Sequence, residues 1–275
     1  MKVFFKNASL IFQKKEENAI TKRIKESLSR FDNSSRQMTY VENFIDELEN
    51  AGILQHVSHL YMPWLSANAD EAFTNMINGA KCTNYSKWSV SHGKAIVSAD
   101  ASTSDVYGVT LPAPAPTINF YGIIRDNKST DLETVTTICG LYGDNIGIGA
   151  FRYKNTSWIG NGITQNQENK GYRPSDLSTL ETLVFEIGAL SALQNDVNTK
   201  INGKQVLVSG SYNYSESLGN TIANVVPSSA NENNQSSAFR TIILIGDGSK
   251  LTEIQRASFM SSLSNLQYNL TQLEK

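Results

Sequence analysis

Hydrophobic positions near the start of the chain follow two different spacings. The run Val3–Phe12 is almost continuously apolar and predicts one strand or a short hairpin. From Lys15 to Phe31, and again from Thr39 to Asn50, apolar residues recur every three or four positions, which predicts two amphipathic helices. We expect residues 1–52 to be an N-terminal segment for attachment or oligomerisation, because so short a segment cannot cover the apolar stripe of its first helix. That stripe consists of Ile20, Ile24, Leu28 and Phe31.

Beyond Gly52 the pattern changes to short apolar segments separated by Gly, Asn, Ser and Pro. Their regular spacing favours an antiparallel sandwich over alternating strands and helices. The pair Asn202-Gly203 predicts the clearest hairpin, because both central residues of such a turn need positive φ. Asn220–Ser237 is polar and predicts a loop. The candidate strands are Ala95–Ser98, Tyr107–Thr110, Thr117–Arg125, Thr134–Tyr142, Ile146–Tyr153, Leu180–Gly188, Thr199–Ile201, Lys204–Ser209 and Phe239–Ile245.

The end of the chain predicts a strand, a tight turn and a closing helix. Thr241–Ile245 is apolar, and Gly246-Asp247-Gly248 stops the strand. Thr252 is the expected N-cap of a helix over residues 252–270 with one apolar face. We therefore expect a mainly β protein, in which residues 53–275 form an antiparallel β-sandwich closed by this helix. The N-terminal segment of a strand plus helices precedes it.

Composition excludes several classes of function. Charged residues make up 18% of the chain and the net charge is -2, so no basic field is present to hold nucleic acid. No apolar run reaches the roughly 20 residues of a membrane span, and Lys6 interrupts the apolar start too early for a signal peptide. Cys82 and Cys139 show no spacing signature. Two reduced thiols are favoured, and a disulfide stays the alternative.

Motifs that carry catalytic or metal chemistry are weak in this sequence. The glycine cluster Gly140–Gly149 fits a turn between strands better than a nucleotide loop, because no helix follows it. His56 and His59 lack a third metal ligand. Glu181 and Glu186 lie five residues apart and fall on opposite faces of a strand, unlike a glycosidase pair. We therefore expect no enzyme activity, no metal and no cofactor.

Aromatic residues are the remaining candidates for binding. Tyr153, Trp158 and Tyr172 cluster in a polar stretch. Exposed rings of this kind can stack on sugars, and they also pack at protein interfaces. Both interpretations remain open from the sequence.

Three stretches carry a resemblance to a known family. Val41–Ile53 followed by Leu60–Trp64 is similar to a helix that leads into an L-Y-P-F-like strand. Thr199–Lys204 is similar to a hydrophobic-N-G hairpin, and Ile242–Leu266 looks like an I-G-D-G-L-T-x-x-E segment with Ser249-Lys250 inserted. In these stretches the chain resembles structural proteins of crAss-like and related tailed phages of Bacteroides-type hosts, which carry a concanavalin/laminin-G-like jelly roll. The rest of the chain is matched by architecture alone.

The resemblance implies a non-enzymatic virion protein, such as a head fibre, capsid decoration or tail appendage. It further implies a dimer or trimer that contacts other virion proteins and is made in the host cytoplasm. The alternative is a carbohydrate-binding module that contacts host surface glycan through Tyr153, Trp158 and Tyr172. A glycoside-active enzyme on the same fold is a third hypothesis, and it requires two acids facing each other in a groove.

Overall fold

The computed structural model describes residues 17–91, apart from 33–34, 84, 86–87, and residues 241–273. Between these ranges it describes strands from 94 to 225 and residues 111–113. The predicted strand at Val3–Phe12 lies outside the described residues. The helices are α1 (Ala19–Ser27), α2 (Arg36–Asn50), α3 (Ala69–Ala72) and α4 (Glu253–Gln272).

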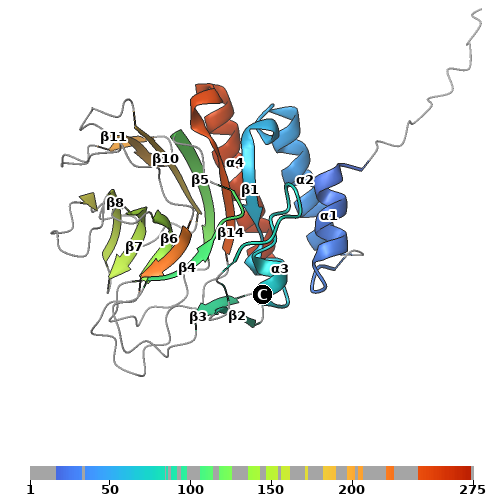
Figure 1. Cartoon of the computed structure of the whole chain (residues 1–275). Coiled ribbons are helices and arrows are strands. Elements are labelled where there is room, and N and C mark those ends of the chain that lie inside the picture. The colour runs from blue at the N-terminus through green and yellow to red at the C-terminus, as the bar shows by residue number, and fades with distance from the viewer. Residues whose placement is uncertain are drawn as a thin grey trace, which may run out of the picture.

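Two six-stranded antiparallel sheets form the body of the molecule (Figure 1). The first sheet has the order β1-β14-β5-β10-β11-β12, from β1 (Val57–Tyr61), β14 (Thr241–Asp247), β5 (Ile118–Arg125), β10 (Thr182–Ala189), β11 (Val197–Ile201) and β12 (Lys204–Val206). The second has the order β4-β13-β6-β7-β8-β9, from β4 (Val106–Thr110), β13 (Thr221–Val225), β6 (Thr136–Tyr142), β7 (Gly147–Tyr153), β8 (Thr156–Asn161) and β9 (Gly171–Tyr172). A separate hairpin pairs β2 (Trp88–Ser91) with β3 (Lys94–Val97).

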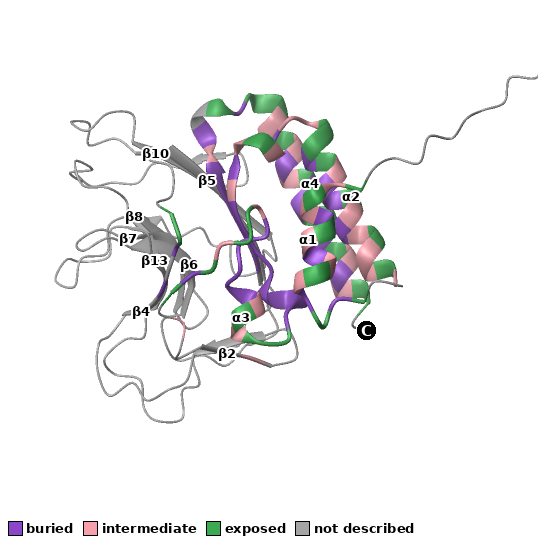
Figure 2. Ribbon diagram, turned by 45° about the vertical axis from the view of Figure 1, so that its right-hand side comes forward, coloured by how far each residue is buried: buried purple, intermediate pink, exposed green. Residues whose placement is uncertain are grey.

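The molecule has three layers, which Figures 1 and 2 show from two directions. The two sheets lie against each other, and α2 and α4 cover the outer face of the first sheet with α1 beside α2. The expected sandwich is present, but the N-terminal helices and the C-terminal helix form one shared layer on it. The two ends of the chain also meet within the sheet, since β1 pairs with β14.

Strand β14 is buried on both faces, which explains its continuous apolar sequence. Ile242 and Leu244 belong to the core that contains the helices, whereas Ile243 and Ile245 alternate with them and are also buried. Side chains alternate between the faces of a strand, so the second pair lies on the side of the other sheet. A strand with one solvated face would have polar residues at every second position.

The expected closing helix is confirmed as α4, and its first residues also cap α2. Thr252 and Gln255 form a reciprocal capping box at the start of α4. The Gln255 Nε2 donates to the carbonyl oxygens of Ala51 at 3.0 Å and Gly52 at 3.3 Å, which lie at the end of α2. Gly52 has a φ of +68°, the left-handed conformation that favours glycine after a helix. One side chain thus connects helices that are far apart in the sequence.

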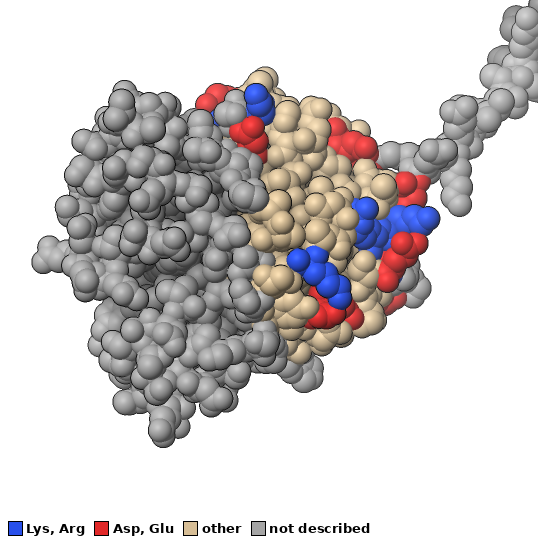
Figure 3. Space-filling view, in the orientation of Figure 1, with Lys and Arg blue, Asp and Glu red and all other residues tan. Residues whose placement is uncertain are grey.

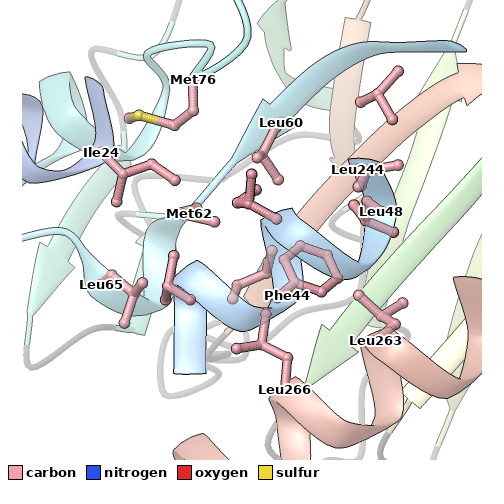
Figure 4. Close-up of a cluster of buried hydrophobic side chains, with 14 of the residues drawn as sticks. Ile24, Phe44, Leu48, Leu60, Met62, Leu65, Met76, Leu244, Leu263 and Leu266 are labelled. Carbon is pink, nitrogen blue, oxygen red and sulfur yellow. The ribbon is translucent and has the colours of Figure 1, made fainter. Parts of the chain in front are cut away.

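The apolar stripe expected of the first helix lies inside the protein, which corrects the expectation of an attachment face. The helix itself is shorter than expected, since α1 ends at Ser27 and the last two residues of the stripe follow it. Ile24, Leu28 and Phe31 are buried and Ile20 packs against the same core. Phe44 of α2 and Leu263 of α4 belong to that core as well (Figure 4). The segment alone is too short to cover its stripe, but the rest of the chain covers it. The stripe is therefore not available to a second copy or to another partner.

The outer edge of β1 is capped by the loop that follows α3. The Asn75 side chain, which is fully buried, accepts from the Leu60 amide at 3.1 Å and donates to the Ser58 carbonyl at 2.9 Å. The Met76 amide donates to the Leu60 carbonyl at 2.8 Å. Arg23 of α1 holds this loop through the carbonyls of Met76 and Ile77, at 2.7 and 2.6 Å. These bonds satisfy backbone groups that an open edge strand would offer to another chain.

The sequence-based strands agree with the structure in most places and differ in a few. The Asn202-Gly203 hairpin is confirmed, since Ile201 pairs with Lys204. Asn220–Ser237 was expected to be a loop, but its beginning is strand β13, between β4 and β6. Besides β13, the strands missed were β1, β2, β8 and β9. Short polar or interrupted segments such as these become strands through their neighbours rather than through their own pattern.

Candidate functional site

The register of the second sheet assigns its strand positions to two faces. Val109 is fully buried, and it pairs with Ile222, which pairs with Leu141. Leu141 in turn pairs with Ile148. Residues opposite each other in neighbouring strands share a face, so these four positions lie on one face of the second sheet. The positions that alternate with them along each strand lie on the opposite face.

The opposite face brings together two of the three predicted aromatic positions. Trp158 pairs with Phe151, and Tyr153 follows Phe151 by two residues in β7. These three positions therefore share one face. Tyr172 pairs with Ile159, the neighbour of Trp158. Since neighbouring residues of a strand lie on opposite faces, the position of Tyr172 is on the other face of the sheet from Trp158. Phe151 was missed in the sequence because nothing in its own neighbourhood marks it; only the pairing of β7 with β8 places it beside Trp158.

A row of glycines crosses the same face next to the aromatic positions. Gly140 pairs with Gly149, Gly149 with Gly160, and Gly160 with Gly171. The row spans β6, β7, β8 and β9, and Tyr142 follows Gly140 by two residues on its other side. Glycine has no Cβ, so a ligand can approach the backbone along such a row. We call this row together with Tyr142, Phe151, Tyr153 and Trp158 the aromatic face.

The strand positions on the face of Trp158 are all uncharged. The six strands of the second sheet contain one charged residue, Arg152, which lies on the face of Val109. The positions on the face of Trp158 are Val106, Gly108, Thr110, Thr137, Gly140, Tyr142, Gly147, Gly149, Phe151, Tyr153, Thr156, Trp158, Gly160, Gly171, Thr221, Ala223 and Val225. In the described part of the surface that Figure 3 shows, by contrast, positive and negative side chains lie interspersed.

A buried polar cluster lies on the opposite side of β1 from the helices. His59 and Tyr61 are both buried and their rings stack, with centroids 6.1 Å apart. The His59 Nε2 donates to the Ala113 carbonyl at 3.2 Å, and its Nδ1 lies 2.8 Å from the Ser58 hydroxyl. Burial lowers the pKa of His59, which the bond to Ala113 partly offsets. A neutral ring thus connects β1 to the segment that follows β4.

Cys82 is a buried free thiol beside this cluster, which answers part of the question about the cysteines. Burial raises its pKa to about 11, so the thiol is protonated and unreactive at neutral pH. Burial also raises the pKa of Tyr61, and the neighbouring Cys82 adds to the shift. The Tyr61 hydroxyl makes no hydrogen bond of acceptable geometry with the residues described. The cluster contains no activated nucleophile, and its residues pack the interior.

The described residues contain neither a metal-binding cluster nor a membrane-spanning helix. Within the described residues, no group of three or more His, Cys, Asp and Glu side chains is arranged to hold a metal ion. None of the helices there combines the length and the apolar character needed to cross a membrane. Glu186 pairs with Phe120 and Lys200 in the first sheet, and Glu181 lies outside the described residues.

Comparisons with known proteins give only distant structural similarity. No protein-family model matches the sequence, and no curated protein matches it. A sialidase of Trypanosoma rangeli in complex with sialic acid matches with a TM-score of 0.48 and 7% identity, over 83% of this chain and 39% of the sialidase. The receptor-binding domain of botulinum neurotoxin D matches with a TM-score of 0.41 and 14% identity, over 76% of this chain and 53% of that domain. The alginate lyase Aly36B matches with a TM-score of 0.37 and 14% identity, over 70% of this chain and 95% of the lyase.

Proposed function

We propose that the chain is a non-enzymatic structural protein of a phage virion that displays its sandwich outward. The layer order supports this function: α1, α2 and α4 cover the outer face of the first sheet, and the second sheet, whose strands contain the aromatic positions, forms the other side of the molecule (Figure 1). The resemblance of Val41–Ile53, Leu60–Trp64 and Ile242–Leu266 to crAss-like phage proteins supplies the virion context. On this proposal the side covered by α1, α2 and α4 faces the particle, and the chain assembles as a dimer or trimer with capsid or tail proteins.

Immunogold electron microscopy tests the virion assignment. Antibody raised against the purified chain should label intact phage particles, and the position of the gold separates a head fibre, a capsid decoration and a tail appendage. Particles labelled with pre-immune serum are the control. Abundant chain in the infected-cell lysate together with unlabelled, chain-free particles would refute the assignment.

We propose glycan binding at the aromatic face as the activity of the displayed side. The observation that favours it is the shared face of Phe151, Tyr153 and Trp158. Aromatic rings offer apolar faces on which the C–H side of a sugar can stack, and their edges still admit polar neighbours. Tyr172 was expected to contribute, but its position has the opposite parity, so the proposed contacts exclude it.

A Trp158→Ala variant tests this activity against a glycan array. We expect the native chain to bind at least one host-type glycan at millimolar concentration or below, and the variant to lose about tenfold in affinity, as removal of a central aromatic contact commonly does. The matched control is Trp88→Ala, which removes a tryptophan from the separate β2–β3 hairpin. Equal binding by both variants, or no binding by the native chain, would contradict the proposal.

A further inference from the structure

We propose that Ser58 and His59 form a proton-sensitive latch, which connects strand β1 to the segment 111–113 that follows β4. In the neutral state the ring of His59 makes this connection through the carbonyl of Ala113. A proton taken up by the ring places a charge inside the protein and rearranges the hydrogen bonds around it. The expected consequence is a fold that loses stability in mild acid.

An irregularity in strand β1 places the two side chains of the latch next to each other. Val57 pairs with Gly246 and His59 pairs with Ile245, so the register of β1 against β14 shifts and Ser58 is an extra residue. Such a β-bulge bends the strand and re-aims a side chain. The Ser58 hydroxyl lies 2.8 Å from the Nδ1 of His59 and 3.2 Å from the carbonyl oxygen of Ile245, so it can bond to either.

The hydrogen bonds determine which ring nitrogen of His59 carries the proton in the neutral state. The Nε2 lies 3.2 Å from the carbonyl oxygen of Ala113, and a carbonyl only accepts, so the Nε2 bears the hydrogen. The Nδ1 is then an acceptor, and the hydroxyl of Ser58 donates to it. The Nδ1 is therefore the atom that gains a proton in acid.

Protonation reverses the hydrogen bond between the two side chains. The new Nδ1–H of His59 needs an acceptor, and the Ser58 oxygen is already within 2.8 Å. The Ser58 hydroxyl then has its own hydrogen free for the Ile245 carbonyl oxygen at 3.2 Å. A proton from solvent thus exchanges a bond within β1 for a bond from β1 to β14, while both ring nitrogens keep partners.

Burial makes the protonated state costly. The side chain of His59 is only 1% exposed, so a charge on it loses its hydration. The ring stacks on Tyr61, and Cys82 lies beside Tyr61. Burial raises the pKa of both Tyr61 and Cys82, so neither offers a negative charge at neutral pH. Next to Cys82 along the chain, Lys81 pairs with Asp70 at the surface.

The neighbouring strands contribute few charged positions around the latch. The one charged residue of β14 is Asp247, which is half-buried and lies two residues beyond Ile245. In β5, Tyr121 pairs with Ile245, and in the second sheet Arg152 shares the face of Val109. Burial is the main influence on the pKa of the ring and lowers it, and the bond to the segment 111–113 offsets this in part.

The pH dependence of unfolding tests the latch in the full chain. The unfolded chain binds a proton at His59 near the ordinary histidine pKa of about 6.5, and the folded chain binds it only at lower pH. The stability that this group contributes is therefore complete above about pH 6.5 and is lost as the pH falls below it. His59→Gln is the comparison, because an amide can still donate to Ala113 and does not titrate. Between pH 7.5 and 5, the equilibrium constant for unfolding in urea should rise at least about threefold more in the native chain than in this variant.

A second variant and a control separate the latch from its surroundings. Ser58→Ala removes the acceptor of the new Nδ1–H, so the titration of His59, followed by proton–nitrogen NMR spectra of the ring, should move to lower pH. His56→Gln is the control, because His56 lies three residues upstream, is partly exposed and precedes β1. We expect it to retain the pH dependence of the native chain.

Three outcomes would overturn the latch. The first is an equal pH dependence of unfolding in the native chain and in His59→Gln. The second is a titration of His59 that Ser58→Ala leaves unchanged. The third is a spectrum of the native chain at pH 7.5 in which the Nδ1 of His59 bears the hydrogen. If His59→Gln fails to fold, the NMR titration and tautomer of the native chain decide, and a midpoint at or above about pH 6.5 would contradict the proposal.

Discussion

Replacing Phe259 with alanine should lower the free energy of unfolding by about 3–5 kcal/mol, the usual cost of truncating a buried phenylalanine. The Phe259 side chain is fully buried in the core that α4 shares with α2 and β14. Truncation removes apolar surface from this core and leaves a cavity that rigid helices fill only in part. Since domains of this kind are stable by about 5–15 kcal/mol, the variant should be close to unfolding at moderate temperature. Urea denaturation followed by far-UV circular dichroism measures the change.

The control for this experiment lies on the same helix. Ile254 is 80% exposed, so Ile254→Ala should change the free energy of unfolding by no more than about 0.5 kcal/mol. Because the core of Phe259 includes Ile24 and Phe44, the N-terminal helices should unfold together with α4 in a single transition. Equal midpoints for the two variants would contradict the packing described for α4. A separate early transition of the N-terminal helices would contradict a shared core.

Asn75→Ala should lower the free energy of unfolding by about 3 kcal/mol, because it removes the partners of the buried Leu60 amide and of two partly buried backbone groups. The Asn75 Oδ1 accepts from the amides of Leu60 at 3.1 Å and Ile77 at 3.0 Å, and the Nδ2 donates to Ser58 at 2.9 Å. The substitution also uncovers the edge of β1, so the variant should associate more readily than the native chain. Chemical denaturation measures the first effect, and analytical ultracentrifugation measures the second.

Asn78→Ala is the matched control in the same loop. Asn78 is exposed, and its Oδ1 accepts only a local bond from the Ala80 amide at 2.9 Å among the contacts described. We expect a loss below about 1 kcal/mol and no change in association. A loss below about 1 kcal/mol in both variants would show that the loop tolerates either change and that Asn75 does not hold the edge of β1.

Several elements of the fold could be predicted because residues close together in the sequence determine them. The spacing of apolar residues indicated α1 and α2, and the capping residue Thr252 indicated the start of α4. The Asn202-Gly203 pair located a hairpin for the same reason. Strand β13 was missed because Thr221–Val225 is weakly apolar, and its place between β4 and β6 depends on partners far away in the chain.

The candidate binding face depends on pairing that no local pattern encodes. Tyr153 and Trp158 were identified as aromatic residues in a polar stretch, and Tyr172 was grouped with them. The register of β8 with β7 and β9 separates these positions, because a shift of one residue moves a position to the other face of a sheet. The same register adds Phe151 and aligns four glycines that lie far apart in the sequence.

The sequence by itself determined the elements that depend on residues adjacent in the chain. These are the amphipathic helices, their caps, a tight hairpin and the apolar strand β14. Only the tertiary structure decided what these elements cover. It placed the stripe of Ile24 and Leu28 inside a core with α4, whereas the sequence indicated an attachment face. It also brought the aromatic positions and glycines onto one face, whose described strand positions are uncharged. An apolar stripe shows that a surface must be buried, but the partner that buries it is set by contacts between residues distant in the chain.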